Sequence, residues 1–431
     1  MAIRIAVIGS GISGLAAAWL LGRHHSVTLF EANTYLGGHS HTVDVTLGQV
    51  SHPVDTGFLV FNRETYPNLV RLFETLEIET ARSEMSFSLS LEEPSIEWSG
   101  TSLGTLFAQP SNLIRPRFLG MLREILRFNR EAARAAQDSG GPTLGEFLAR
   151  GGYGPQFRDW YLLPMAAAIW SCPTRAMLAF PFASFARFFR NHGLLALSGR
   201  PQWYTVAGGA RRYVERMARA LPDVRLGTPV ESMRRDGSGV RIRGEHFDAA
   251  VLACHADQAL AILGESASAQ ERAVLGAIPY QRNRAVLHTD ATLLPRRRRV
   301  WSAWNYTAGR DGPDGRPVAV HYLLNRLQPL PFAEPVIVSL NPHRAPEPGR
   351  VLGEFDYEHP VFDARSLGAQ ARLADIQGAA RTWYCGAWTR YGFHEDGLRS
   401  ALAVAYRFGV AAPWSRAAGI PRAAVPERAA A

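Results

Sequence analysis

The sequence predicts an α/β protein in which a parallel sheet is combined with a second, mixed α+β region. Three features of the 431 residues lead to this expectation: an N-terminal strand–turn–helix–strand unit, a helix-rich middle, and a return to short strands. Apolar residues make up 47% and charged residues 20%, which is the balance of a folded globular protein. At this length, two interleaved domains are expected.

The N-terminal unit is the stretch "IRIAVIGSGISGLAAAWLL" with the "VTLFEA" that follows it. Apolar residues 3–8 predict a buried strand and 26–30 a second one, with a helix over 12–23 between them. A strand, a tight glycine turn, a helix and a second strand form a βαβ unit. The chain is therefore expected to open with half of a doubly wound sheet.

The turn carries three glycines in the pattern G-x-G-x-x-G. Gly9 allows the tight turn, Gly11 lets the backbone approach a pyrophosphate, and Gly14 lets the helix pack on the strand. The helix points its positive N-terminal end at the phosphates. Glu31 ends the second strand 17 residues after Gly14, where it can accept hydrogen bonds from ribose hydroxyls. These features predict a Rossmann-like dinucleotide site.

The residues after Glu31 indicate which dinucleotide binds. In "EANTYLGGHSHT", Gly37 and Gly38 follow the acid at the spacing E-x-x-x-x-x-G-G, with His39 next. This resembles the extended FAD motif of the glutathione-reductase-like and amine-oxidase-like flavoproteins, in which an arginine follows the glycine pair. The resemblance implies FAD, with His39 in the arginine's place as a pyrophosphate or ribityl contact.

The far end of the chain agrees. "YCGAWTRYGFHEDGLRSALAVA" (384–405) resembles the C-terminal flavin segment of the amine-oxidase and phytoene-desaturase superfamily, and Gly386, Gly397 and the helix from Leu398 match its elements. Val230, in "TPVESM", matches the position whose backbone contacts the adenine. The residues expected to contact FAD are Gly9, Gly11, Ile12, Ser13, Gly14, Glu31, Ala32, Gly37, Gly38, His39, Ser40, Thr56, Gly57, Val230, Gly386, His394, Gly397 and Leu398.

The resemblance implies a Rossmann-like FAD-binding domain of the glutathione-reductase/amine-oxidase type and an α+β substrate domain. We expect the FAD-binding domain to be discontinuous, with the substrate domain inserted into it. The predicted boundaries are 1–65, 200–270 and 375–412 for the FAD-binding domain, 66–199 and 271–374 for the substrate domain, and 413–431 for a mobile tail.

Within these limits the patterns place further elements. Residues 87–100 read as a hairpin, 110–192 as mainly helical, and 225–254 as a three-stranded meander. Between 283 and 341, four short apolar stretches predict the strands of a second sheet.

Composition excludes several classes of site. Cys172, Cys254 and Cys385 are far apart, which argues against structural disulfides and a thiolate zinc site, and we expect no metal. No apolar run is long enough to span a bilayer, and we expect a cytoplasmic protein. The net charge of +9 is not arranged as a nucleic-acid signature, so no nucleic-acid partner is expected.

An anionic membrane surface fits this charge better. The basic stretch 117–136 could be an amphipathic helix at the inner face of the membrane or an ordinary surface helix. Arg296 to Arg299 could contact lipid headgroups or form a solvated turn.

All 47 basic residues are arginine, and the chain has no lysine. Many amine oxidases of the superfamily hold a water near the flavin through a lysine. The absence of lysine weakens the interpretation of this chain as an amine oxidase.

Aromatic residues crowd the middle of the chain. "FPFASFARFFRNHG" holds five phenylalanines between 180 and 189, and "WYLLPMAAAIW" (160–170) adds three further aromatic rings. Such clusters could line an apolar tunnel for a lipid chain. An aromatic core of a helical domain is the simpler interpretation and is favoured by the residues alone.

The chain as a whole resembles one bacterial branch of the superfamily, through "GGHSHTVDV", "VDTGFLVFN", "YQRNRAVLHTD", "WSAWNY" and "HPVFD". Members of this branch often accompany cyclopropane-fatty-acid-synthase-like methyltransferases. The resemblance implies an FAD-dependent desaturase of a methylated unsaturated fatty acyl chain, with a methyltransferase as partner. A flavin amine oxidase, a carotenoid or phytoene-type desaturase and a lipid-carrying membrane flavoprotein without catalysis are the alternatives.

Candidates for the catalytic groups are few. His394 and Glu395 lie on the loop that passes the flavin in the superfamily, and Tyr306 and Tyr322 lie on the predicted substrate sheet. Desaturation sends a hydride to the flavin while a base removes the neighbouring proton. Glu395 and Asp396 could instead cap the helix that follows, and we favour that for Asp396.

Overall fold

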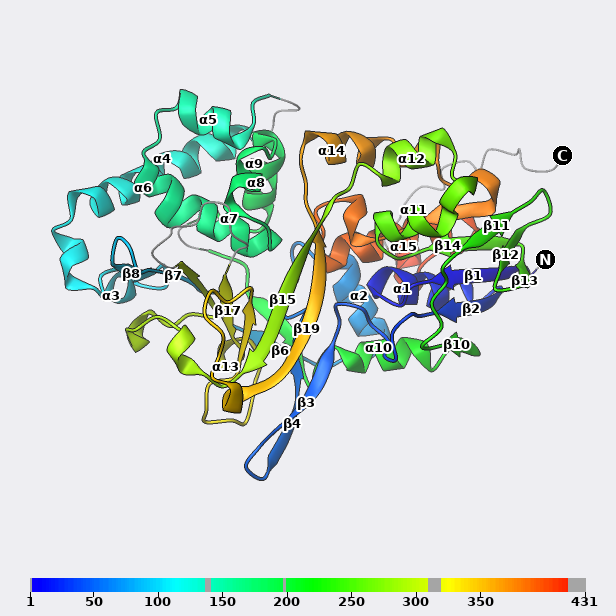
Figure 1. Ribbon diagram of the computed structural model, residues 1–431, viewed down its shortest axis with the longest axis horizontal. Helices are drawn as coiled ribbons and strands as arrows, with labels where there is room; N and C mark the ends of the chain where they lie inside the picture. The colour runs from blue at the N-terminus through cyan, green and yellow to red at the C-terminus, as the bar shows by residue number, and fades with distance from the viewer. Residues whose placement is uncertain (1, 136–140, 197–198, 309–318, 418–431) are drawn as a thin grey trace.

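The computed structural model of the chain describes residues 2–135, 141–196, 199–308 and 319–417. Figure 1 shows two halves: a parallel sheet with its helices on the right, and a mixed sheet below a helical lobe on the left. Two long strands, β15 (Tyr280–His288) and β19 (Val351–Pro360), run between the halves.

The right half is built on a five-stranded sheet in which all neighbouring strands are parallel. Its strand order is β10 (Asp223–Arg225), β2 (Ser26–Phe30), β1 (Arg4–Ile8), β14 (Ala249–Leu252) and β20 (Thr382–Tyr384). These strands come from three stretches far apart in the sequence. The sheet therefore confirms the predicted Rossmann-like fold.

Alternate residues of β1 face two different layers. Ile5 and Val7 belong to the core shared with α1 (Ile12–Leu21), whereas Ala6 and Ile8 face the core beneath α11 (Ala256–Leu263). Because side chains alternate along a strand, a strand buried on both faces is apolar throughout, as β1 is. On the α1 side lie α10 (Arg211–Ala218) and α15 (His394–Arg407), and on the α11 side lies the antiparallel meander β11 (Met233–Arg235), β12 (Val240–Ile242) and β13 (Glu245–Phe247).

The left half is built on a seven-stranded sheet. Its order is β19, β15, β18 (Ile337–Leu340), β17 (Val320–Leu323), β16 (Trp304–Ala308), β7 (Phe87–Leu91) and β8 (Ile96–Ser99). All neighbouring pairs are antiparallel except β16 and β7, which are parallel. The pair β15–β19 is the longest, with Tyr280 opposite Pro360 at one end.

The helical lobe lies over one end of this sheet (Figure 1). It consists of α3 (Leu103–Leu106), η1 (Pro110–Leu113), α4 (Pro116–Ala135), α5 (Leu144–Arg150), α6 (Pro155–Phe157), the π-helical turn η2 (Arg158–Leu162), α7 (Leu163–Trp170), α8 (Thr174–Leu178) and α9 (Phe182–Asn191). Phe180, Phe182, Phe185, Phe188 and Phe189 are all buried in the lobe. They form its core, which confirms the simpler of the two interpretations of the aromatic cluster.

The remaining elements complete the two halves and the connections between them. They are the hairpin β3 (Thr42–Leu47) and β4 (Val50–Asp55), the small sheet β5 (Phe61–Asn62), β9 (Trp203–Val206) and β6 (Thr80–Ser83), and the helices α2 (Pro67–Thr75), α12 (Ala269–Leu275), α13 (Leu324–Leu327) and α14 (Ala364–Ala371). Short 3-10 turns are η3 (Gly264–Ser266), η4 (Ala291–Leu293), η5 (Arg298–Val300), η6 (Pro348–Arg350), η7 (Leu373–Asp375), η8 (Ala379–Arg381), η9 (Ala387–Thr389) and η10 (Pro413–Ala417).

Most predicted elements are present, but β19, which pairs with β15 along its whole length, was not predicted from the sequence. The predicted domain boundaries stay predictions. Helix α2, in the predicted substrate domain, packs against α15 of the predicted FAD-binding domain. The predicted tail begins with η10, whose Trp414 Nε1 donates to Asn68 Oδ1 over 3.3 Å. Residues 418–431 of that tail lie outside the described residues.

Among the described residues, no helix combines the length and the apolar character that crossing a bilayer requires.

Candidate functional site

The glycine turn after β1 has the geometry that a phosphate site needs. Gly9 has a φ of +98°, which disfavours any side chain. A Cβ on Gly14 would lie 1.8 Å from the Gly9 carbonyl oxygen, so only glycine allows α1 to start here. A Cβ on Gly11 would meet no atom within 4 Å. The turn is thus packed tightly behind Gly9 and Gly14 and open in front of Gly11.

Helix α1 starts at this opening without a side-chain cap. The first N–H groups of a helix lack partners within it, and they carry its positive dipole. Ile12 and Ser13 stand in this first turn, where both side chains are buried. An anionic diphosphate in front of Gly11 would receive these N–H groups.

Glu31 is held in place by a serine of the glycine turn. Its Oε2 accepts hydrogen bonds from Ser10 N over 2.8 Å and Ser10 Oγ over 2.5 Å, and its Oε1 accepts one from Asn33 N over 2.8 Å. A carboxylate has more lone pairs than these three bonds use. Glu31 therefore stays available to a ribose, with Ala32 exposed beside it. The role of Ser10 was not predicted from the sequence, because the residue occupies a variable position of the glycine motif.

Val230 lies in the segment that runs beside Glu31. Gly227 N donates to Asn33 O and Thr228 N donates to Glu31 O, each over 2.8 Å. The Val230 side chain belongs to the core cluster of Ile8 and Phe30. The structure thus brings the predicted adenine-side residue to the predicted ribose-side one.

The second glycine pair lies directly against the first turn. Gly37 and Gly38 have φ values of +113° and +57°, and a Cβ on Gly38 would approach Gly11 Cα to 3.2 Å. Gly37 N donates to the carbonyl of Ser10 over 3.2 Å. Two glycine segments 26 residues apart in the sequence therefore share one opening.

His39 enters a cluster of rings next to this opening. Its ring centroid lies 5.0 Å from Tyr357, 5.1 Å from His359 and 6.3 Å from His255. Burial and the neighbouring His359 and His255 hold its pKa well below 6.5, so it is neutral at neutral pH. Its Nε2 is buried with no hydrogen-bond partner among the described residues. When this unpaired nitrogen takes up a proton, it can donate a hydrogen bond to an anionic group bound beside the glycine turn.

A second helix N-terminus converges on the first. A Cβ on Gly397 would lie 2.8 Å from both Ile12 Cγ2 and Ser13 Oγ, so α15 can approach α1 only with glycine there. The loop before α15 is tied down by Gly386 N, which donates to Ser400 Oγ over 2.9 Å. Two positive helix ends thus lie side by side.

Leu398 departs from the expectation. Its side chain is fully buried in the core, and the preceding N–H, that of Gly397, already donates to Phe393 O over 3.0 Å. The N–H groups of α15 that can receive a ligand therefore precede Leu398.

His394 connects α15 to the loop after the second glycine pair. Its Nε2 lies 2.8 Å from Ser40 Oγ and 3.1 Å from Tyr213 OH, and its ring stacks on Phe58 at a centroid distance of 3.6 Å. Burial lowers the pKa of His394 to about 3. His394 is thus a neutral hydrogen-bonding group rather than a poised base. Ser40 also bonds Tyr213 directly.

The loop of Thr56 and Gly57 joins the glycine segments to the substrate sheet. Phe58 N donates to His39 O over 2.7 Å, and a Cβ on Gly57 would lie 2.2 Å from that same oxygen. Thr56 Oγ1 is hydrogen-bonded to Tyr357 OH on β19 at 2.7 Å. Tyr357 is therefore a site residue that was not predicted from the sequence, because its strand, β19, was not predicted either.

Comparison with known proteins agrees with this arrangement. The family model described as flavin containing amine oxidoreductase matches residues 12–281, which is more than half of the chain. The chain belongs to the flavin-containing amine oxidoreductase family. No curated protein sequence matches it significantly.

Solved structures share the fold of this amine oxidoreductase over nearly the full chain. Cyclohexylamine oxidase from Brevibacterium oxydans IH-35A is 17% identical, with a TM-score of 0.66 over 95% of this chain and 100% of that one. A CLA-producing fatty acid isomerase from P. acnes is 16% identical, with a TM-score of 0.65 over 95% and 99%. A putrescine oxidase is 16% identical, with a TM-score of 0.65 over 95% and 99%.

The protein is an FAD-dependent oxidoreductase. FAD, when bound, supplies a two-electron acceptor that takes up a hydride. The residues of this chain fit it: an open Gly11, uncapped N–H groups on α1, a partly used Glu31 carboxylate and the unpaired Nε2 of His39. Among the described residues, no group of three histidines, cysteines or acids could hold a metal ion.

In this amine oxidoreductase, Glu395 caps a helix, and its predicted role as a base stays a prediction. Its Oε1 accepts hydrogen bonds from Asn68 N (3.2 Å) and Asn68 Nδ2 (2.6 Å), and its Oε2 accepts one from Leu69 N (3.0 Å). These groups belong to the first turn of α2, so Glu395 caps a helix other than its own. Asp396 caps α15 itself, since its Oδ2 accepts a hydrogen bond from Phe393 N over 3.1 Å.

The two predicted catalytic tyrosines lie on neighbouring strands of the seven-stranded sheet. Tyr322 on β17 hydrogen-bonds Ser171 at the end of α7 and packs edge-on against Trp304 at 4.9 Å. Tyr306 is buried on β16, opposite Val320. A catalytic role for either tyrosine stays a prediction.

Proposed function

We propose that this FAD-dependent oxidoreductase desaturates a methylated, unsaturated fatty acyl chain. The observation that carries the proposal is an apolar stripe of three partly buried side chains along η2 and α7. Tyr161, Met165 and Ile169 lie four residues apart on η2 and α7, so they share one face. None of them is charged, as an acyl chain requires.

The first residue of the stripe contacts the substrate sheet. Tyr161 stacks on Trp98 of β8 at a centroid distance of 6.1 Å, and α7 packs against β16. The stripe begins in a π-helical turn, a geometry that is frequent at functional sites. An acyl chain lying between α7 and the sheet would contact aliphatic and aromatic groups along its length.

An aromatic path leads from the lobe to the flavin-side helix. Trp170 lies 4.5 Å from Phe188, and Phe188 stacks on Phe393 at 5.0 Å. Phe393 directly precedes His394 at the start of α15. The apolar lobe and the N-terminus of α15 are thus in direct contact, which supports a dry reaction site between them.

Two further observations favour an acyl chain over an amine. The chain has no lysine, so the lysine-held water that many amine oxidases of the superfamily use is absent. One protein of the same fold is a fatty acid isomerase, at 16% identity. In the proposed reaction, an allylic C–H bond beside the methyl-substituted double bond loses a hydride to the flavin. A base removes a proton from the adjacent carbon, which forms the new double bond.

The chemistry also implies what supplies the substrate. A methyl-branched unsaturated chain arises by methyl transfer to an unsaturated acyl chain, so a methyltransferase is the expected preceding enzyme and partner.

Flavin bleaching without oxygen tests the proposal. Phospholipid with a methylated unsaturated chain should reduce the bound flavin, and polyamines should not. A charge in the stripe, Met165→Glu, should abolish reduction by lipid, whereas Met165→Leu and the exposed lobe control Ala149→Glu should retain it. Reduction by amines alone would contradict the proposal, as would bleaching by lipid that Met165→Glu leaves unchanged.

Mass spectrometry of membrane fatty acids gives an independent check. Cells that make the protein should contain a methylated acyl chain with two hydrogens fewer than cells that lack it.

A further inference from the structure

Exposed apolar side chains are concentrated at one place on the surface. Nine large hydrophobic residues are exposed in the part of the chain that the structure describes, and five of them lie between residues 103 and 126. The most exposed are Ile114, at 83%, and Leu103, at 76%. We call these five the apolar tip: Leu103, Leu113, Ile114, Leu119 and Leu126. An exposed apolar cluster of this kind marks an interaction site.

The tip belongs to the outer surface of the helical lobe. Leu103 starts α3, Leu113 ends η1, and Leu119 and Leu126 lie on α4. In Figure 1 these cyan elements form the left edge of the molecule, at the end away from β1.

The exposed face of α4 carries arginines and no acid. Between the two leucines and beyond them, Arg117, Arg123, Arg130 and Arg134 are exposed. Arg123 lies four residues after Leu119, and Arg130 and Arg134 lie four and eight residues after Leu126, so these three arginines share the face of the two leucines. Arg117 lies in the first turn of the helix.

The two acids of α4 are turned away from this face. Glu124 Oε1 accepts a hydrogen bond from Gly154 N over 3.1 Å and pairs with Arg127 at 3.8 Å. Glu131 Oε2 accepts one from Tyr153 OH over 2.7 Å. Both therefore serve the contact between α4 and the loop before α6, and they leave the outer charge of α4 positive.

Further charges surround the tip. Arg296, Arg298 and Arg299 are exposed next to α3, which contacts η5. The exposed acids Glu92 and Glu93 lie in the β7–β8 turn, whose Ser95 O accepts a hydrogen bond from Arg115 Nη1 over 3.1 Å. The two acids do not balance the seven exposed arginines.

The side chains of the apolar tip do not form the core of the lobe. The inner face of α4 is already filled by Phe118, Met121, Phe128 and Ala132, which are buried against the rest of the lobe.

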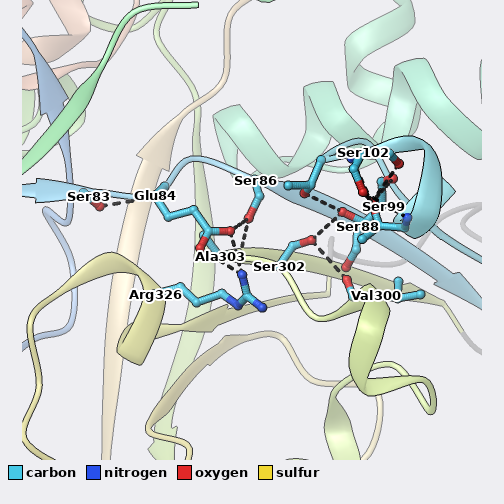
Figure 2. A network of polar contacts seen from close by, with 12 residues as sticks. Ser83, Glu84, Ser86, Ser88, Ser99, Ser102, Val300, Ser302, Ala303 and Arg326 are labelled. Carbon is cyan, nitrogen blue, oxygen red and sulfur yellow. Dashed lines mark hydrogen bonds and ion pairs between the residues drawn. The ribbon is translucent and has the colours of Figure 1, made fainter. Parts of the chain in front are cut away.

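The base of the lobe is bonded to the sheet through Thr105 of α3, whose Oγ1 donates to Ser99 O over 3.1 Å. Figure 2 shows a network in which Ser99 Oγ bonds Ser302 Oγ at 2.9 Å and Arg326 Nη1 donates to Glu84 Oε1 over 2.8 Å. Ser102 caps α3 directly beyond this network. The tip is thus presented on a rigid support.

We propose that the apolar tip and the arginine face of α4 dock onto the surface of an anionic phospholipid bilayer. Leucine and isoleucine side chains enter the boundary between headgroups and acyl chains, as those of an interfacial amphipathic helix do. The arginines bind lipid phosphates, which their planar guanidinium groups match. This inference goes beyond the proposed substrate and does not depend on it.

Vesicle flotation of the FAD-loaded full chain tests the docking surface. The protein should float with vesicles that contain phosphatidylglycerol and phosphatidylcholine, and less with phosphatidylcholine alone. Arg123→Gln with Arg130→Gln should weaken partition into anionic vesicles by about 25-fold, because each arginine near the surface contributes roughly fivefold. Leu113→Ser with Ile114→Ser should weaken binding to anionic vesicles at high salt as well.

Matched variants elsewhere on the surface are the controls. Leu226→Ser with Leu352→Ser replaces two other exposed leucines, and Arg216→Gln with Arg219→Gln removes two charges at the C-terminal end of α10. All variants should keep their flavin content and melting temperature. The controls should bind vesicles as the parent protein does.

Three results would overturn the inference: equal binding to neutral and anionic vesicles, unchanged binding of the tip variants, or equal losses in the controls. A tip-dependent dimer of a protein that binds no vesicles would also overturn it and assign the surface to a second copy of the chain. Failure of the proposed substrate is distinct, because it would abolish flavin reduction by lipid while vesicle binding persists.

Discussion

In the five-stranded sheet, polar side chains gather beyond the carboxyl ends of the strands, whereas in the seven-stranded sheet they lie between the strands. Ser10, Glu31 and His39 belong to the first group and surround an opening. The second group is a chain across four strands: His288 Nε2 bonds Ser339 Oγ at 2.7 Å, and Ser339 Oγ bonds His321 Nδ1 at 2.6 Å.

This second chain is complete within the protein. His321 Nε2 bonds Thr307 Oγ1 at 2.7 Å, and Asp290 N donates to His288 Nδ1 over 3.0 Å, so every ring nitrogen has a partner. By contrast, His39 keeps an unpaired Nε2. The comparison indicates that the histidine chain of the seven-stranded sheet serves the fold, whereas the unpaired nitrogen of His39 is left for a ligand.

The largest effect on the ligand-facing group is expected from a substitution in its glycine turn. Gly14→Ala places a methyl group against the Gly9 carbonyl, so we expect the free energy of unfolding to fall by about 3 kcal/mol or more. Bound flavin should be lost as well. Gly11→Ala is the matched control, because its Cβ meets open space. It should stay folded and bind flavin more weakly, as thermal melting and flavin absorbance would show.

Acid should lower the stability of the protein through the buried histidine chain of the seven-stranded sheet. Burial lowers the pKa of His288 to about 4 and that of His321 to about 3, from 6.5 in the unfolded chain. The unfolded chain therefore takes up protons first, and stability present above pH 6.5 is lost as the pH falls toward these values. Each histidine should contribute about 1.4 kcal/mol per pH unit over that range.

Denaturant unfolding between pH 7 and pH 4 measures this slope. His321→Gln should make it shallower, whereas the exposed control His24→Gln should leave it unchanged. An unchanged slope in His321→Gln would show that the buried chain does not titrate as described.

Replacing Glu395 tests whether its carboxylate stabilises the fold or takes part in the reaction. Glu395→Gln weakens the bonds to Asn68 and Leu69, so the free energy of unfolding should fall by about 1.5 kcal/mol. The rate of flavin reduction should not change, because the carboxylate caps α2. Stopped-flow absorbance checks this, and a slow rate at unchanged stability would restore Glu395 as a catalytic group.

His39 gives the smallest expected effect. A guanidinium stays charged where the imidazole is held neutral, so His39→Arg should tighten FAD binding about tenfold at pH 7.5, or about 1.4 kcal/mol. The affinity of the parent protein for FAD should rise as the pH falls, because bound diphosphate favours the protonated ring. Titration calorimetry at several pH values should show this dependence in the parent and not in His39→Arg.

The same contrast explains what the sequence could predict. The glycine turn, Glu31 and the Gly37–Gly38 pair lie in two short stretches, and their spacing reports their geometry directly. Strand β19 also had a readable pattern, since Val351, Gly353, Phe355 and Tyr357 alternate with exposed residues. The strand was not predicted because acidic residues occupy some of its positions, so it contains no continuous apolar stretch.

Other contacts had no local signal. Tyr213 meets Ser40 across 173 residues, and Glu395 meets Asn68 across 327. Glu395 stands in the first turn of α15, so its own helix was the natural partner to expect. Only the packing of α2 against α15 shows which helix it caps.

The contact of Gly397 with Ile12 and Ser13 has a consequence for how the protein is made. The first turn of the cofactor site is synthesised near the start of the chain, but the helix that completes it follows almost 400 residues later. Domains that are continuous in sequence can fold as they leave the ribosome, N-terminal part first. Here the N-terminal βαβ unit must wait for α15, so flavin loading follows translation of that last helix.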